Sequence, residues 1–139
     1  MKVEKIDHIA IRVKDLGKAI EFFNDLFGTE FSEPVAQEKL GVRNCFDPLG
    51  IELVESLSPD GPLARLIERK GEGLACLVLK VPNLEEAIAE MTSRGITLVR
   101  KFQGLKTKAA TFHPKDTFGV MIELLEYKSK HPIVALRGQ

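Results

Sequence analysis

Four side chains that could bind a metal ion or move a proton interrupt strand-like apolar stretches: His8, Glu52, Cys76 and Glu123. His8 lies in KIDHIAIRV and Cys76 in GLACLVLKV, while the glutamates lie in IELVE and IELLE. Imidazole, thiolate and carboxylate together suit a divalent ion such as Zn²⁺, Co²⁺, Ni²⁺, Mn²⁺ or Fe²⁺. Taken singly, a strand histidine or glutamate is more often solvated or hydrogen-bonded, and a strand cysteine more often belongs to the core. Their relative positions must therefore decide between the two interpretations.

The first half of the chain predicts a strand, a helix and a hairpin. Residues 6–13 alternate apolar and other types, which is typical of a half-buried strand. Apolar residues at helical spacing follow Asp15 and end at Gly28, so these two residues are the expected N-cap and stop. Strands are expected at 42–46 and 51–55. Because side chains alternate along a strand, we expect His8 and Glu52 to point away from the helix.

The second half repeats this order. A strand is expected at 74–81, then a helix that begins after Asn83 and stops at Gly95, then strands at 110–114 and 119–127. The helix caps match at an offset of 68 residues and the last strands at 71. We infer an internal duplication of a βαβββ unit. The duplication pairs His8 with Cys76, and Glu52 with Glu123.

The predicted fold class is α+β, with two tandem βαβββ modules that form a curled mixed sheet around a central cleft, helices outside. We expect a single domain over 1–139. Its parts are module one at about 4–56, a linker with a short helix at about 57–73, module two at about 74–127 and a C-terminal tail at 128–139.

Charge and composition favour a small-molecule partner. The chain has 20 basic and 20 acidic residues, which gives no reason to expect nucleic acid or a membrane surface. No apolar run approaches the length of a membrane span or a signal-peptide core, so we expect a cytoplasmic protein. Cys45 and Cys76 are expected to be free thiols.

The repeat and its motifs resemble the vicinal oxygen chelate (glyoxalase, bleomycin-resistance and dioxygenase) superfamily over roughly residues 4–127. Within it the chain most resembles the methylmalonyl-CoA epimerase family, through IDHIAIRVKDLGKAIEFF and IELVESLSPDGPLARLIERKGEG. The most specific motif is the ending FHPKDTFGVMIELLE.

The resemblance implies a divalent metal ion held by residues of four strands. His8, Glu52 and Glu123 match the family's ligands, and Cys76 stands where the family usually has histidine. A thiolate there would add negative charge and lower the Lewis acidity of the metal. The sequence therefore leaves open an altered metal site or a lost metal.

The resemblance also implies chemistry by enolate stabilisation on an acyl-CoA or small oxyacid, as an epimerase, a racemase or a lyase of the glyoxalase type. Glu123 and Glu52 are the expected catalytic residues. Asn44 stands where some relatives carry a glutamate, and an amide cannot shuttle a proton. Arg12, Asn44 and Lys115 are candidate substrate-binding residues, and a homodimer is expected.

Two alternatives remain open at this point. One is a non-catalytic or metal-poor homologue that binds a small ligand. The other is a dioxygenase, which normally needs two histidines and one carboxylate.

Overall fold

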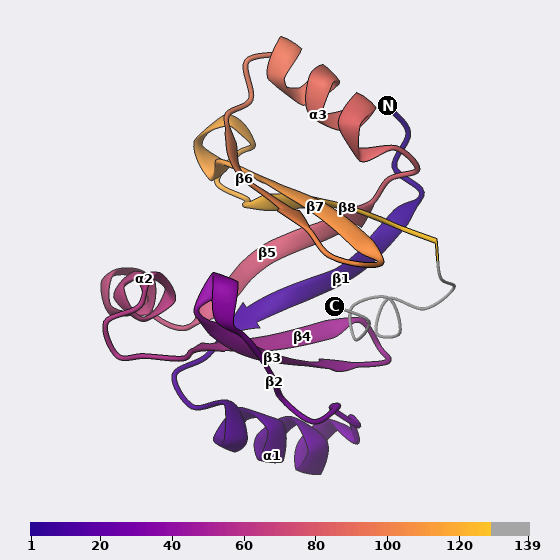
Figure 1. Ribbon diagram of the computed structural model, residues 1–139. Coiled ribbons are helices and arrows are strands. Elements are labelled where there is room, and N and C mark those ends of the chain that lie inside the picture. Colours follow the sequence, from indigo (N-terminus) through magenta and orange to yellow (C-terminus); the bar gives the residue numbers. More distant parts are fainter. Residues whose placement is uncertain (129–139) are drawn as a thin grey trace. The chain divides into compact units, whose positions relative to one another are not determined.

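The computed structural model describes residues 1–128, which fold into two compact units of strands and helices (Figure 1). The first unit is Ile9–Ala75, and the second is Met1–His8 together with the chain from Cys76 onward. The elements run in the order β1 (Lys5–Arg12), α1 (Leu16–Phe27), β2 (Val35–Gln37), η1 (Glu38–Leu40), β3 (Val42–Asp47), β4 (Ile51–Ser56), α2 (Pro62–Lys70), β5 (Gly73–Lys80), α3 (Leu84–Ser93), β6 (Leu98–Gln103), β7 (Thr107–Phe112), η2 (Pro114–Asp116) and β8 (Ile122–Tyr127). The α+β class is confirmed.

The first unit is a mixed sheet covered by α1. Its strand order is β2-β3-β4-β1, with β1 parallel to β4 and the other pairs antiparallel. Leu53 and Cys45 are almost completely buried and pack with Val13 and Leu16 at the start of α1. Ile11 packs against the same cluster. The prediction that alternate residues of β1 face the helix is therefore confirmed.

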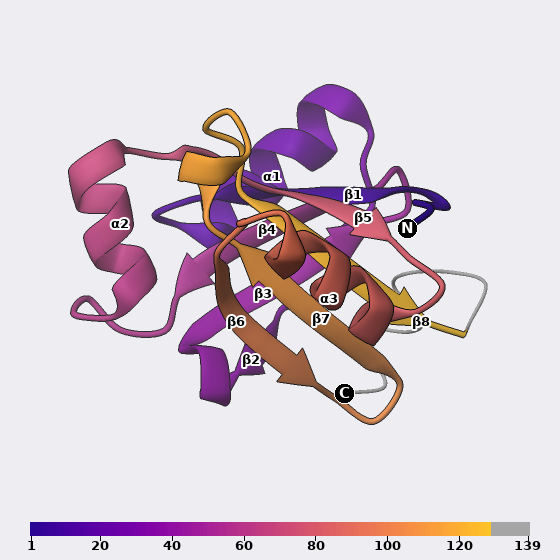
Figure 2. The same cartoon turned by 90° about the horizontal axis from the view of Figure 1, so that it is seen from above.

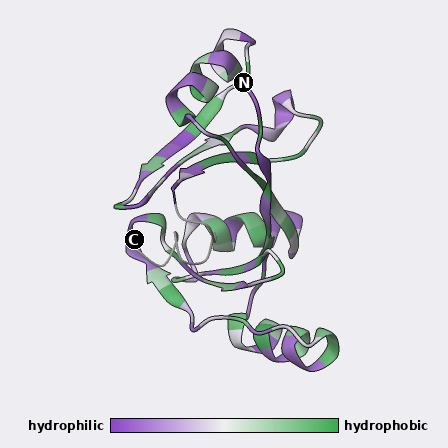
Figure 3. Ribbon diagram, turned by 90° about the vertical axis from the view of Figure 1, so that its right-hand side faces the viewer, coloured by the Kyte–Doolittle hydropathy of each residue, from purple (hydrophilic) through white to green (hydrophobic). Residues whose placement is uncertain are grey.

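Both ends of α1 form as the sequence predicts. The Asp15 side chain accepts a hydrogen bond from the Lys18 N–H at 3.0 Å, which satisfies one of the helix's unpaired amides. Gly28 ends the helix with φ 66°, a left-handed conformation that favours glycine. Figure 3 shows hydrophobic and hydrophilic residues alternating along the helices, as expected where one face packs on a sheet.

The second unit repeats the arrangement. Its strand order is β5-β8-β7-β6, with β5 parallel to β8 and the remaining pairs antiparallel. Asn83 caps α3 by accepting from the Glu86 N–H at 3.1 Å. Helix α3 lies over β7, as Figure 2 shows, and contributes Leu84 and Ala87 to a core that contains Phe112 and Leu124.

The strand registers support the predicted duplication. In the first unit Ala10 of β1 lies opposite Glu52 of β4, and in the second Val78 of β5 lies opposite Glu123 of β8. The first strands thus match at the offset of 68 residues and the last strands at 71, as in the sequence. His8 and Cys76 each precede these opposed residues by two positions. Each pair therefore occupies equivalent places in its repeat.

Three details differ from the sequence prediction. The βαβββ pattern predicted two strands, β2 and β6, without assigning residue ranges to them. Strand β7 begins at Thr107 instead of 110, and β8 begins at Ile122 instead of 119 because Pro114–Asp116 and the residues after it form a short helix and a turn. The linker helix is confirmed as α2.

The exact module boundaries and the single domain stay predictions, and the tail from 129 onward lies outside the described residues. In the described part of the chain, no helix is long and apolar enough to cross a membrane.

Candidate functional site

Glu52 and Asn44 form the polar centre of the first unit's sheet on the face opposite α1. Leu53 belongs to the core beneath the helix, so its neighbour Glu52 points the other way. Glu52 lies opposite Phe46 in the register, and Asn44 is two residues from Phe46 on the same face. The Asn44 Nδ2 donates a hydrogen bond to the Glu52 Oε2 at 3.0 Å. This amide therefore holds one carboxylate oxygen in place.

The other end of the Asn44 amide has a distinctive environment. Its Oδ1 is buried, and within residues 1–128 it has no hydrogen-bond partner. A buried carbonyl oxygen without a donor costs about 1–3 kcal/mol. A bound ligand that carries an N–H or O–H group would satisfy it. Asn44 as a substrate-binding residue stays a prediction, and this atom gives that prediction a chemical basis.

Arg12 connects β1 to the end of the linker. Its Nε donates to the Gly71 carbonyl and its Nη1 to the Leu74 carbonyl, both at 2.9 Å. These bonds fix the chain at the start of β5. Two of the guanidinium nitrogens thus serve the fold. Recognition of a substrate carboxylate by Arg12 stays a prediction.

His8 is buried in the second unit and is held by an ionised neighbour. Its Nδ1 lies 2.7 Å from the Asp7 Oδ2, and the Tyr127 hydroxyl donates to the Asp7 Oδ1. Burial opposes ionisation of Asp7, but the hydrogen bonds from His8 and Tyr127 outweigh it and hold the pKa of Asp7 below its usual value. Asp7 therefore accepts both bonds as a carboxylate.

Cys76 and Glu123 share the face of the second unit's sheet that lies away from α3. Leu124 belongs to the core under α3, so Glu123 points to the opposite face. On that face Cys76 packs against a cluster of Val78, Ala109, Leu125 and Tyr127. The opposed residues of Glu123 are Val78 on β5 and Thr111 on β7. The predicted facing of Cys76 and Glu123 agrees with this arrangement.

The two cysteines have different surroundings. Neither forms a disulfide within the described residues; Cys45 is buried and Cys76 is partly exposed. Burial, together with the negative charge of Glu52, raises the pKa of Cys45 to about 12. Cys45 is therefore a core residue. A role for Cys76 as a metal ligand stays a prediction.

Lys115 lies in η2, after β7, and is exposed. Its backbone N–H donates to the His113 Nδ1 at 3.0 Å, so His113 caps this short helix. This matches the expectation of a turn at His113–Pro114. A contact between Lys115 and a substrate stays a prediction.

No group of three or more His, Cys, Asp and Glu side chains suited to a metal ion is found among residues 1–128. The four-ligand set of His8, Glu52, Cys76 and Glu123 therefore stays a prediction. The donor chemistry of His8 does fit a metal ligand. A carboxylate that contacts one imidazole nitrogen orients the ring, as is usual for a ligating histidine.

Sequence reasoning missed Asp7 and Tyr127, which hold His8. Alternation places neighbouring strand residues on opposite faces, so Asp7 was not considered a partner of His8. The available signal was an aspartate beside a histidine in a stretch that the pattern predicts to be buried. An ionised carboxylate in such a place needs hydrogen-bond donors nearby.

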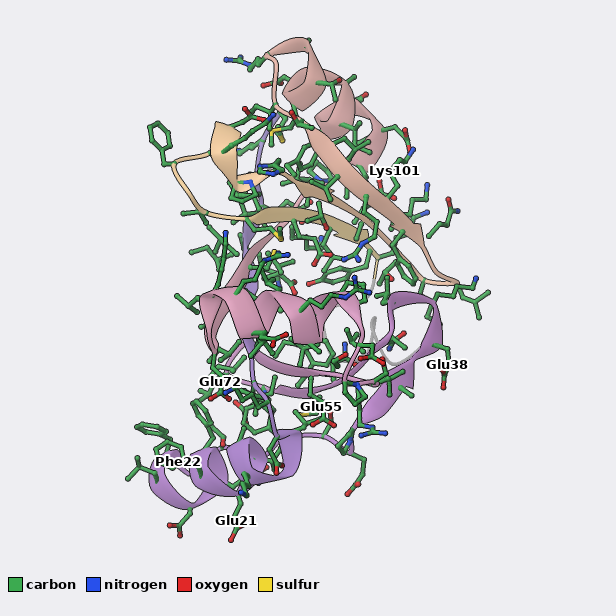
Figure 4. All side chains as sticks on the ribbon, turned by 90° about the vertical axis from the view of Figure 1, so that its left-hand side faces the viewer. Glu21, Phe22, Glu38, Glu55, Glu72 and Lys101 are labelled. Carbon is green, nitrogen blue, oxygen red and sulfur yellow. The ribbon has the colours of Figure 1, made fainter. Side chains whose placement is uncertain are left out.

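The repeated glutamates at the ends of IELVE and IELLE were also missed. Glu55 accepts from the Leu16 N–H, and Glu126 accepts from the Leu84 N–H, both at 2.8 Å. Each satisfies the first amide of the helix in its own unit. Figure 4 shows Glu55 between β4 and α1. The shared final glutamate of IELVE and IELLE thus has the same structural role in both units.

Comparison with known proteins agrees with this architecture. The model of the Glyoxalase/Bleomycin resistance protein/Dioxygenase superfamily matches residues 5–124. The chain belongs to this superfamily. Human mitochondrial methylmalonyl-CoA epimerase is 33% identical over 127 residues, which cover 86% of this chain and 72% of the human protein. The bovine mitochondrial enzyme is 32% identical over 127 residues, covering 86% of this chain and 73% of its own.

Among solved structures of the superfamily, methylmalonyl-CoA epimerase from Mycobacterium tuberculosis superposes with a TM-score of 0.82. It is 29% identical and covers 92% of this chain and 91% of its own. The resemblance inferred from the sequence is therefore confirmed at the level of superfamily and fold.

Proposed function

We propose that this protein is a metal-dependent epimerase of the vicinal oxygen chelate type that acts on a 2-carboxyacyl-CoA thioester. The observation that carries the proposal is the equivalent placement of the two glutamates. Glu52 lies opposite Ala10, two positions after His8, and Glu123 lies opposite Val78, two positions after Cys76. Kinship with proteins named methylmalonyl-CoA epimerase gives the substrate class. The cytoplasm and a homodimer remain expectations.

His8, Glu52, Cys76 and Glu123 would hold the divalent ion, whether Co²⁺, Zn²⁺, Ni²⁺, Mn²⁺ or Fe²⁺. When bound, such an ion supplies Lewis acidity that stabilises negative charge on the oxygen of a thioester. The fit rests on the donor types and on the orientation of His8 by Asp7. Cys76 supplies a thiolate in place of the family's imidazole, which favours softer ions.

The two glutamates occupy equivalent places with different residues beside them. Glu52 is held by the Asn44 amide, which favours a fixed carboxylate that binds and orients. Glu123 lies opposite Val78 and Thr111, and the residue at the place equivalent to Asn44 is Ala109. We assign to Glu123 the removal of the proton next to the thioester.

The group that returns a proton on the opposite face is not Asn44, since an amide is neither an effective acid nor an effective base near neutral pH. Its buried Oδ1 instead suits an accepted hydrogen bond from the substrate. Asn44 thus contributes binding and the orientation of Glu52. Arg12 and Lys115 remain candidates for the substrate carboxylate and a CoA phosphate.

Hydrogen exchange tests the proposal directly. The metal-free protein is loaded with each divalent ion in turn and incubated with 2-methylmalonyl-CoA in D₂O, and uptake of deuterium is followed by mass spectrometry. We expect exchange above the protein-free rate, lost in Glu123→Gln and kept in Glu86→Gln, a control at an exposed carboxylate of α3. Absence of exchange with every ion would overturn the proposal for this substrate.

A ligand-binding role without turnover is the second candidate, and Asn44 and Cys76 favour it because they differ from the family's acid/base and ligand. Under this alternative, CoA thioesters raise the melting temperature while no deuterium enters the substrate. Turnover that depends on Glu123 would exclude it.

A further inference from the structure

Arg100 on β6 lies on the same face of the second unit's sheet as Glu123, and no proposed step has used it. Within that sheet Glu123 on β8 is opposite Thr111 on β7, and Thr111 is opposite Arg100. Directly opposed residues of antiparallel strands share a face of the sheet. The two charged residues therefore flank Thr111 in one row across three neighbouring strands, which Figure 1 shows side by side.

The neighbours of Arg100 on β6 support this facing. Phe102, two residues further along the strand, packs against the apolar cluster on the face that lies away from α3. Lys101, between them, points the other way, because its Nζ donates to the Glu85 Oε1 of α3 at 3.1 Å. Side chains alternate along a strand, so Arg100 shares the face of Phe102, which is the face of the candidate site.

An irregularity in β6 gives Arg100 this direction. The register between β6 and β7 shifts between Leu98 and Arg100. Leu98 packs on the core beneath α3, so unbroken alternation would turn Arg100 toward α3 as well. The shift reverses the alternation, and Arg100 faces away from α3 instead. Irregularities of this kind are common beside active sites, where they redirect a side chain.

Charged residues on an edge strand also discourage pairing with other chains, and that role alone would explain Lys101. Arg100 differs from Lys101 in its contacts. It is exposed, and it makes no hydrogen bond or ion pair with any residue of the described stretch 1–128. A guanidinium group has five N–H donors in a planar fork. Residues 1–128 thus leave this fork to another partner.

The proposed substrate brings an anionic group to this face. The carbon that loses its proton carries both the thioester and a free carboxylate, and Glu123 is the assigned base. Two carboxylates repel each other at close approach, and a cation on the same face offsets that repulsion. Strand spacing places Arg100 and Glu123 about 10 Å apart at the backbone, so their long side chains can contact one small molecule.

We propose that Arg100 binds the free carboxylate of a 2-carboxyacyl thioester on the sheet face that carries Glu123, and so makes the protein selective for thioesters with this group. The guanidinium fork matches a carboxylate through two parallel N–H···O bonds. The inference rests on the proposed function for the substrate class. Arg12 is less suited to this task, because its guanidinium already donates to the Gly71 and Leu74 carbonyls.

Two ligands that differ only in the carboxylate test the inference. The full chain is titrated by calorimetry with 2-methylmalonyl-CoA and with propionyl-CoA, and the ratio of the two affinities measures what the carboxylate contributes. We expect the parent to bind 2-methylmalonyl-CoA about tenfold or more tightly. Arg100→Gln should lose most of this preference and keep its affinity for propionyl-CoA. Arg100→Lys should retain part of the preference, because an ammonium group keeps the charge without the planar fork.

Lys101→Gln is the matched control. It removes one positive charge from the same strand, one residue away and on the other face of the sheet. General attraction between the protein and an anionic CoA thioester therefore changes as it does in Arg100→Gln. The ratio of the two affinities in Lys101→Gln should equal that of the parent.

The remaining outcomes overturn the inference. A parent protein that binds the two thioesters equally, or binds neither, has no selectivity for the carboxylate. An Arg100→Gln variant that keeps the parent's preference shows that another group binds the carboxylate. Equal loss of affinity for both ligands would instead place Arg100 on a phosphate of CoA. Arg100→Lys gives the same comparison if Arg100→Gln does not fold, which circular dichroism would show.

Deuterium exchange separates this inference from the proposed function. A parent protein that selects 2-methylmalonyl-CoA through Arg100, and exchanges no α-proton with any ion, contradicts the proposed epimerase and leaves the carboxylate site in place. A parent protein that exchanges the proton, while Arg100→Gln keeps the full preference for 2-methylmalonyl-CoA, supports the epimerase and overturns the role of Arg100.

Discussion

The hydrogen bond between Asn44 and Glu52 makes the effect of a new charge at position 44 calculable. Asn44→Asp replaces the donor amide by a carboxylate at nearly the same place, about the 3.0 Å of the present bond from the Glu52 Oε2. Two unit charges at that separation repel by about 1 kcal/mol at the permittivity of water and by about 5 kcal/mol at an effective permittivity near 20. Asn44 is half-buried, so the cost should lie between these limits.

The cost depends on pH in a defined direction. Protonation of the introduced carboxyl removes the repulsion, so its pKa is raised in the folded state above its unfolded value of about 4. The folded variant then binds more protons than the unfolded chain, and its stability falls as pH rises above about 4, until the raised pKa is passed. Urea unfolding should therefore find the variant close to the parent near pH 4 and about 1–5 kcal/mol less stable near pH 8.

Two controls distinguish charge repulsion from the loss of the hydrogen bond. Asn44→Ala removes the bond without adding charge, so its free energy of unfolding should fall by a similar amount at both pH values. Asn44→Asp in a Glu52→Gln background should lose the added pH dependence. If Asn44→Asp is destabilised equally at pH 4 and pH 8, the assigned contact between Asn44 and Glu52 is wrong.

Three further predictions concern the scaffold. Glu55→Ala and Glu126→Ala each remove the carboxylate that accepts from the first amide of a helix at 2.8 Å. Urea unfolding should show each variant about 1–2 kcal/mol less stable than the parent. The loss of stability in the double variant should equal the sum of the two single losses. Cys45, with its pKa raised to about 12 by burial, should resist iodoacetamide at pH 8 while Cys76 is alkylated, as peptide mass spectrometry would show. The pKa of Asp7 is lowered by its hydrogen bonds, so the contribution of Asp7 to stability is present above about pH 4 and is lost as the carboxylate protonates at lower pH. The difference in unfolding free energy between the parent and Asp7→Asn should therefore shrink on acidification.

Most of the fold was predictable because the duplication supplied each signal twice. Asp15 and Asn83 were identified as equivalent caps, and both side chains cap their helices. The facing of Glu52 and Glu123 followed from strand alternation once the neighbouring leucines were assigned to the core. A period of two is reliable where one face of a strand is buried.

Strands β2 and β6 were not placed because both lie at sheet edges, where the alternation that identifies a strand is weak. Val35–Gln37 is short and mostly exposed, and Leu98–Gln103 carries Arg100 and Lys101. Charged residues are common on edge strands, where they discourage pairing with other chains. Such residues resemble a loop when the sequence alone is considered.

The hydrogen bonds of the candidate residues were not predictable from the sequence. His8 and Cys76 were found through their equivalence, whereas the partners Asp7 and Tyr127 are 120 residues apart. The local periodicity of a sequence does not indicate contacts between residues that are so far apart in the chain. The pairing exists because β1 and β8 contribute to the same unit, which is a property of topology.

The two repeats differ in the residue beside their glutamates, which bears on the proposed epimerase chemistry. An epimerase must treat the two faces of a planar enolate differently, removing a proton from one and returning it to the other. Glu52 has an amide from Asn44, whereas the equivalent place beside Glu123 is Ala109. The equivalent places beside the two carboxylates thus differ in side chain. If this asymmetry carries the proposed function, Ala109→Asn, which would supply Glu123 with the amide that Glu52 has, should slow deuterium uptake more than it lowers substrate affinity.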